Sequence, residues 1–129
     1  MGTVFLIHRW FGGMILPLLL LAAAIWFTVT WKRDSWPGRP AKAFRMLVDT
    51  QFLLGLSFWL YMIYVGAGAR YLAFPFILHP LMGLLAATVA TLSVRQGHRV
   101  ARLGRWAPLV SLGLLRVVVL IAGTLARIL

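Results

Sequence analysis

The chain has no cysteine and almost no acidic residues. Its 129 residues include no Cys and 2 Asp or Glu, against 13 Lys or Arg. Without thiols there are no disulfides, no thiolate-held metal clusters and no covalently attached c-type haem. Any redox chemistry must therefore use a cofactor held by other side chains. Soluble catalysis is not supported either, because no nucleophile, base and orienting group come together in the sequence.

Polar sequence is also scarce. Hydrophobic residues make up 62% of the chain and the mean hydropathy is +0.92, which lies outside the range of soluble globular domains. A bilayer core about 30 Å thick needs roughly 20 apolar helical residues to cross it. Four such stretches, at about 10–30, 46–66, 72–94 and 107–128, fill most of the chain. We therefore predict an all-α integral membrane protein, with a single transmembrane domain over residues 1–129.

The net charge of +11 is concentrated between the apolar stretches. The two basic segments contain Lys32, Arg33, Arg39, Lys42 and Arg45, and then Arg95, Arg99, Arg102 and Arg105. The positive-inside rule places both segments in the cytoplasm and both termini outside. Short connections favour an antiparallel up-and-down bundle. The partner of these charges is the lipid bilayer rather than nucleic acid, which needs a basic face on a folded soluble domain.

Two of the apolar stretches begin with the same motif, a histidine four positions before a glycine. His8 is followed by Gly12, and His79 by Gly83. Positions i and i+4 share a helix face, so each imidazole stands above a residue without a side chain, in a flat slot that suits a porphyrin. The first and third helices run parallel, so the histidines lie on the same side of the membrane. They are candidate axial ligands of one b-type haem.

Simpler interpretations exist for both histidines and for the arginines near them. His8 can be an interfacial residue in contact with headgroups, and His79 can be bonded to a neighbouring helix. Arg9 and Arg70 lie at the outer interface, where they could pair with haem propionates through charge-assisted hydrogen bonds. The alternative for either arginine is ordinary snorkelling to the interface. The shared H-x-x-x-G opening, 71 residues apart, indicates a repeated two-helix unit, although the second and fourth helices align poorly.

Three further polar residues lie inside the predicted spans. Asp49 and Gln51 lie near the cytoplasmic start of the second helix, where they could accept a proton or contact a quinone. The structural interpretation ties Asp49 to Arg45 one turn earlier. Arg116, near the middle of the fourth helix, is the deepest permanent charge and needs a partner in the bundle, in a cofactor or on another protein.

The segment 48–56, Val-Asp-Thr-Gln-Phe-Leu-Leu-Gly-Leu, and the segment 78–83, Leu-His-Pro-Leu-Met-Gly, carry a family resemblance. With the amino-terminal His8, they resemble small four-helix bacterial membrane proteins labelled cytochrome b. The resemblance implies a haem-binding electron carrier, or a small subunit of an electron-transfer complex, in the bacterial cytoplasmic (inner) membrane. Two histidines in the spans allow at most one bis-histidine haem, whereas di-haem cytochromes of this size need four.

Two functions from different classes therefore remain open. The first is a membrane cytochrome with one haem b between His8 and His79, carrying electrons between a quinone pool and a partner redox centre. It would be an electron-transfer subunit more than a catalyst on its own. The second is a cofactor-free accessory or assembly subunit of a larger respiratory or photosynthetic complex. In a variant of the second, one histidine ligates the magnesium of a chlorophyll-type pigment.

Overall fold

The computed structural model describes residues 2–32, 36 and 38–128, and all regular structure within them is helical. The first column of the bundle joins α1 (Gly2–Trp10), a π-helix η1 (Phe11–Ile15) and α2 (Leu16–Val29). The second joins α3 (Gly38–Met62), η2 (Ile63–Ala67) and α4 (Gly68–Tyr71). The third is α5 (Leu78–Arg95), connected by α6 (Gly97–Val100) and η3 (Ala101–Trp106) to the fourth, α7 (Ala107–Ile128). Four helical segments are long and apolar enough to cross a membrane.

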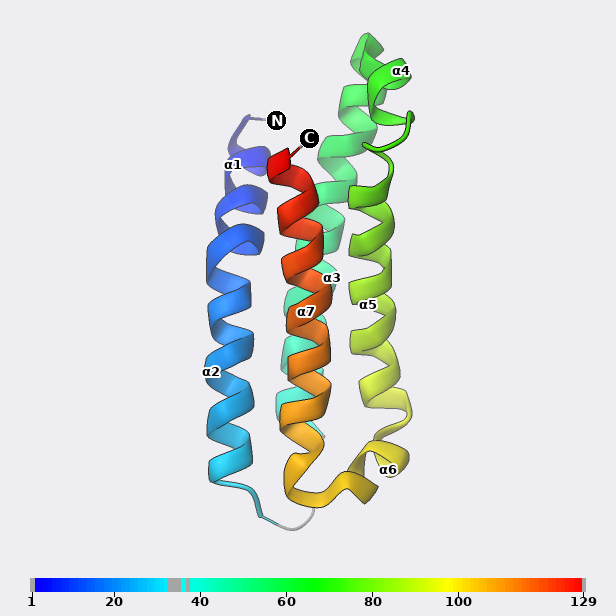
Figure 1. Ribbon diagram of the computed structural model, residues 1–129. Helices are drawn as coiled ribbons and strands as arrows, with labels where there is room; N and C mark the ends of the chain where they lie inside the picture. The colour runs from blue at the N-terminus through cyan, green and yellow to red at the C-terminus, as the bar shows by residue number, and fades with distance from the viewer. Residues whose placement is uncertain (1, 33–35, 37, 129) are drawn as a thin grey trace.

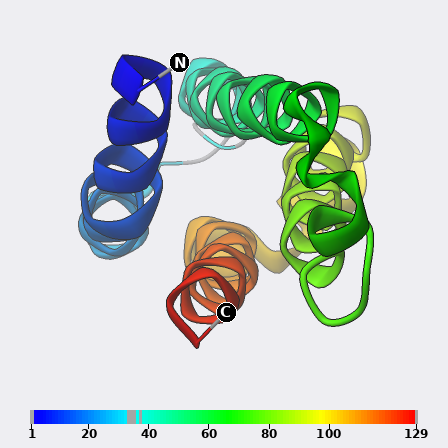
Figure 2. The same ribbon diagram turned by 90° about the horizontal axis from the view of Figure 1, so that it is seen from above.

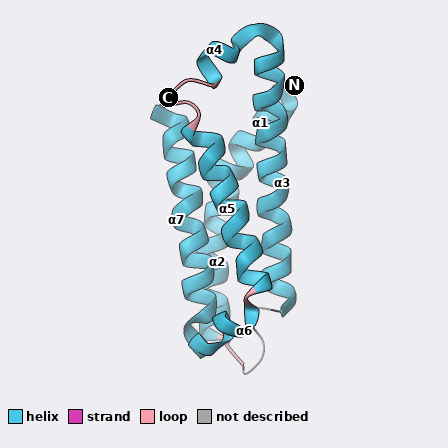
Figure 3. Cartoon of the chain, turned by 90° about the vertical axis from the view of Figure 1, so that its right-hand side faces the viewer, coloured by secondary structure: helices cyan, strands magenta, loops and turns pink. Residues whose placement is uncertain are grey.

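The four columns stand at the corners of a square (Figure 2). Sequence neighbours pack antiparallel, and α2 closes the ring against α7. As a result α1 and α2 lie diagonally opposite α5, and α3 lies diagonally opposite α7 (Figure 2). Both termini lie at one end of the bundle (Figure 1), and η2 and α4 project beyond that end (Figure 3). An all-α bundle of four antiparallel columns is therefore confirmed.

The helix limits differ from those predicted at three places. α1 begins at Gly2 rather than near residue 10, and α3 begins at Gly38 rather than 46, so that Arg39, Lys42 and Arg45 lie inside a helix and not in a loop. The third spanning helix begins at Leu78 rather than 72, because residues 72–77 form turns that contain a cis peptide bond before Pro75. His79 consequently lies in the first turn of its helix, not two turns below its start.

The first helical column changes its hydrogen bonding ahead of Pro17. Leu16 N–H donates to Phe11 O, one residue further back than in an α-helix. Pro17 has no N–H, so the Gly13 carbonyl lacks its usual i+4 donor. Arg127 Nη2 on α7 donates to this carbonyl at 3.4 Å. The proline therefore produces a π-turn here, with a polar contact to α7.

The core supports an internal repeat at the same interval of 71 residues that separates the histidines. Ala41 and Val48 are the buried residues of α3, with 5% and 2% of their surfaces exposed. The positions 71 residues later, Leu112 and Val119, are also buried, at 2% and 8%. The second and fourth columns thus bury equivalent positions, although their side chains at these positions are dissimilar. The column pair α1–α3 corresponds to the pair α5–α7.

Candidate functional site

His8 and His79 meet across the centre of the bundle. His8 comes from α1 and His79 from the diagonally opposite α5. Their ring centroids are 5.9 Å apart, and the ring planes cross at 78°. Both side chains are partly buried. The structure therefore brings together two residues that are 71 positions apart in the sequence.

Each imidazole is anchored to the helix that follows its own column. His79 Nδ1 donates to the Ala122 carbonyl of α7 at 2.8 Å, and His8 Nδ1 lies 3.2 Å from the Gln51 carbonyl of α3. The partner is 43 residues further along the chain in both cases. Among the described residues, neither Nε2 has a hydrogen-bond partner. The internal repeat thus supplies two imidazoles with the same backbone anchor.

The two anchors differ in one side chain, that of Gln51. Its amide nitrogen donates to the His8 carbonyl at 2.8 Å and also lies 2.9 Å from His8 Nδ1. His8 Nδ1 can donate to the Gln51 carbonyl or accept from the Gln51 amide, but one nitrogen cannot do both. The Gln51 Oε1 atom is buried and has no partner among the described residues. Gln51 therefore controls which nitrogen of His8 carries the proton, whereas Ala122 fixes the proton of His79 on Nδ1.

The glycines that follow the histidines are not open slots. A side chain at Gly12 would overlap the Gln51 amide, and a Cβ at Gly83 would lie 3.1 Å from Cδ2 of Phe52. The glycine that accommodates an imidazole is Gly55 on α3, where a Cβ would overlap His8 Cε1. Gly55, which lies one turn after Gln51 on α3, was not singled out from the sequence.

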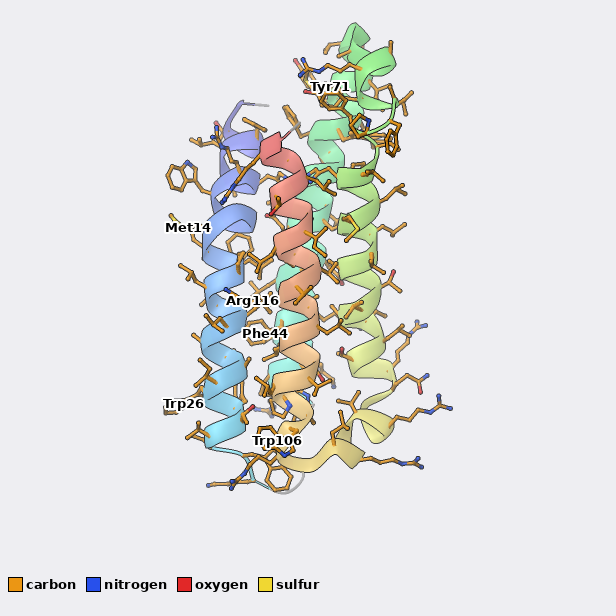
Figure 4. The ribbon with its side chains drawn as sticks, in the orientation of Figure 1. Met14, Trp26, Phe44, Tyr71, Trp106 and Arg116 are labelled. Atoms are coloured by element: carbon orange, nitrogen blue, oxygen red, sulfur yellow. The ribbon has the colours of Figure 1, made fainter. Side chains whose placement is uncertain are left out.

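Arg9 and Arg70 do not converge with the histidines. Arg9 is exposed on α1. Arg70 lies on the projecting α4, with its guanidinium carbon 4.9 Å over the Phe76 ring. Tyr71 marks this projecting end in Figure 4. The arginine that does cross between columns near this end is Arg127, which sequence reasoning did not single out as a site residue.

The polar residues deeper in the bundle are separate from the histidine pair. Asp49 forms the ion pair with Arg45 that the i,i+4 spacing favours, with Arg45 Nε to Asp49 Oδ2 at 3.6 Å. Asp49 lies well inside α3, because this helix begins at Gly38. Arg116 lies about midway along the bundle between α2 and α7 (Figure 4), and its Nε donates to the Pro17 carbonyl at 3.3 Å. Neither residue contributes to the imidazole site.

Comparisons with known proteins give this chain no relatives. No protein-family model matches it, and no curated protein and no solved structure is significantly similar to it. The resemblance to small cytochrome b proteins therefore stays a prediction. The geometry of the chain itself must carry the functional argument.

Proposed function

We propose that this protein is a membrane-embedded b-type cytochrome, or a haem-bearing subunit of a larger redox complex, with His8 and His79 as the two axial ligands. The observation that carries the proposal is the pair of neighbouring imidazoles, each with its Nδ1 atom within hydrogen-bond distance of a backbone carbonyl. Metal-bound histidines usually donate their second ring N–H to a carbonyl or carboxylate, which fixes the tautomer and the ring orientation. His79 has this arrangement, and His8 can adopt it.

The spacing of the rings also suits one shared metal ion. Bonds from a metal to imidazole nitrogen are about 2.0–2.1 Å long, so two imidazoles that bind one ion must lie close together. The ring centroids of His8 and His79 are 5.9 Å apart. A haem bound there would supply reversible one-electron transfer. His8 and His79 would provide the two donor nitrogens, and each imidazole is held by a contact with the column that follows its own.

The glycine positions limit how a porphyrin would be accommodated. Gln51 covers Gly12 and Phe52 covers Gly83, so both side chains must turn away from these glycines on binding. Arg9 and Arg70 remain proposed propionate partners. In this proposal the end of the bundle that carries both basic segments faces the bacterial cytoplasm, and both termini face outside. Electrons pass between a quinone pool and a partner redox centre.

A cofactor-free accessory subunit is the second candidate. The covered glycines favour it, because a bundle with filled slots needs no cofactor to complete its packing. In that case His8 and His79 are structural residues that tie the α1 column to α3, and α5 to α7, through their backbone contacts. Replacing either histidine would then change stability and not colour.

A reduced-minus-oxidised visible spectrum of the purified protein, with pyridine-haemochrome quantification, tests the proposal. We expect low-spin b-type bands from about one haem per chain. The variants His8→Ala and His79→Ala should lose these bands, while His98→Ala, outside the predicted spans, should keep them. A well-folded wild-type protein without haem bands after expression with added haem precursor would contradict the cytochrome and leave the accessory subunit.

A further inference from the structure

Arg116 is a permanent charge at the depth of the bilayer centre. It lies on α7 (Ala107–Ile128), about 14 Å from the start of the helix at a rise of 1.5 Å per residue. Its side chain is partly buried between α7 and α2 (Figure 4). From this depth the side chain is too short to reach either interface of a core about 30 Å thick. A charge held there is costly, and such residues usually pair with another group.

The described residues provide Arg116 with one hydrogen bond, from its Nε to the Pro17 carbonyl at 3.3 Å. This contact leaves both terminal nitrogens and the charge itself unmatched. The chain has two acidic residues. Asp49 lies 3.6 Å from Arg45, and Asp34, in the segment between α2 and α3, falls outside the described residues.

The internal repeat contains a second arginine at the matching position. Arg45 precedes Arg116 by the repeat interval of 71 residues, and it lines a small cavity together with Ser111 and Leu115 of α7. Arg45 has Asp49 one turn later. Arg116 has Leu120 at the corresponding place. The first half therefore contains its own counter-charge, and the second half lacks one.

An open, mostly apolar face runs along α7 on the side next to Arg116. It is formed by Val117, Leu120, Ile121, Thr124 and Leu125, all from this one helix, and we call it the α7 face. Val117 is 52% exposed and Ile121 is 44% exposed. Beside Arg116 on the same helix, Gly113 has no atom near the place a side chain would take. The surface thus combines an apolar helix face about two turns long with Arg116, which lies one turn before Leu120 on the same helix.

We propose that the α7 face binds a transmembrane helix of a different membrane protein, and that this helix carries an Asp or Glu at the depth of Arg116. The carboxylate supplies the counter-charge that the second half of the chain lacks, and the apolar residues of the bound helix pack against the α7 face. A two-fold contact between two copies through α7 would bring Arg116 close to Arg116 of the other copy, and like charges repel. Of the two acids in another copy, Asp49 is already paired, and Asp34 belongs to the segment between α2 and α3 and not to a spanning helix. Hence the occupant is a protein of another sequence.

A designed peptide tests the proposal without knowledge of the natural partner. The probe is a leucine-alanine transmembrane helix with one central Glu and one Cys a turn away, compared with matched peptides that carry Gln or Lys in place of Glu, in phosphatidylcholine vesicles. Because the chain has no cysteine, the single substitution Ile121→Cys reports contact with the α7 face, through a disulfide to the peptide that a mild added oxidant forms, and Leu53→Cys, at an exposed α3 residue, is the control. We expect the Glu peptide to bind roughly tenfold more tightly than the Gln peptide, and to crosslink to the Ile121→Cys variant.

Three variants separate charge recognition from packing. Arg116→Leu should abolish the preference for Glu, Arg116→Glu should transfer it to the Lys peptide, and Arg45→Gln should retain it. Equal binding of the Glu and Gln peptides to the wild type would overturn the proposal, as would an unchanged preference in Arg116→Leu. Loss of the preference when phosphatidylglycerol is added would assign Arg116 to lipid phosphate instead. Predominant crosslinking of the Ile121→Cys variant to other copies of itself would show a homo-oligomer and overturn the proposal as well.

Discussion

The two halves of the bundle share one backbone plan and differ in a few side chains. In each half, the first of its two columns carries a histidine whose Nδ1 contacts a backbone carbonyl 43 residues later. In the first half that carbonyl belongs to Gln51, whose amide also contacts the histidine, and in the second half to Ala122. The first half pairs Arg45 with Asp49 one turn later, whereas Arg116 in the second half has Leu120 at that place.

This comparison separates what builds the site from what specialises it. The shared features, a histidine, a carbonyl anchor and a buried register, are those that bring two imidazoles to 5.9 Å. The unshared features make the histidines chemically unequal and leave one half with an unmatched charge. The two half-sites therefore share their backbone arrangement and differ in their chemistry. Substitutions that remove or copy one of these differences test its role.

The largest effect is expected from a side chain at Gly55. A Cβ there overlaps His8 Cε1, so Gly55→Ala forces the imidazole away from α3 and from its anchor on Gln51. Overpacking of this kind costs about 1–3 kcal/mol of unfolding free energy, and haem bound through His8 should be lost. Denaturant titration in mild detergent and haem content measure the two effects.

The second half provides a matched control for this change. Ala126 corresponds to Gly55 in the repeat, already carries a Cβ and is exposed. Ala126→Val should therefore alter the unfolding free energy by less than about 0.5 kcal/mol. If Gly55→Ala were as harmless as Ala126→Val, the close contact between α3 and His8 would not be a requirement of the site.

A smaller effect is expected when Gln51 is made apolar. Gln51→Leu keeps the backbone carbonyl but removes the amide that donates to the His8 carbonyl and lies 2.9 Å from Nδ1. His8 can then only donate from Nδ1, as His79 does. The lost hydrogen bond costs about 0.5–1.5 kcal/mol, partly offset because the orphan Oε1 disappears as well.

Nitrogen-15 NMR of the imidazoles in the haem-free protein measures this tautomer directly. In the wild type we expect His8 to carry its proton on Nε2, because the Gln51 amide makes the shorter contact with Nδ1. His79 should carry it on Nδ1. Gln51→Leu should make the two histidines alike, whereas Ala122→Val leaves the carbonyl anchor of His79 in place and should change neither. Identical tautomers in the wild type would show that Gln51 does not distinguish them.

The sequence predicted those features that depend on spacing and composition. Four apolar stretches and the charges between them indicate the four-column bundle, and the parallel first and third helices bring His8 and His79 to one side. The limits of the helices were less predictable. Arg39, Lys42 and Arg45 look like a loop by composition but lie in α3, whose first turn accommodates Pro40. Residues 72–77 look like a helix by hydropathy but contain turns.

The sequence predicted that the two histidines lie on one side of the bundle, but it did not predict the side chains around them. A helix face can be read from the interval between His8 and Gly12, but the side chain that covers Gly12 comes from α3 and depends on how the columns are rotated. The same is true of Phe52 over Gly83 and of His8 over Gly55. Such contacts are set by tertiary packing between columns, for which a single sequence has no local signal.

The smallest effect on stability is expected from a variant that copies the charge pattern of the first half into the second. Leu120→Asp places a carboxylate one turn after Arg116, as Asp49 stands one turn after Arg45 at 3.6 Å. Pairs at this helical spacing contribute about 0.3–0.5 kcal/mol when exposed, so little change in unfolding free energy is expected.

The effect of Leu120→Asp on peptide binding should be larger, because Arg116 then has its counter-charge within the chain. The Glu-bearing transmembrane peptide should bind Leu120→Asp no better than the Gln peptide does, while Leu120→Asn, which alters the α7 face without adding charge, should keep the preference. If Leu120→Asp still favoured the Glu peptide, the missing acid would not be what distinguishes the two halves, and the α7 face would recognise its partner by packing alone.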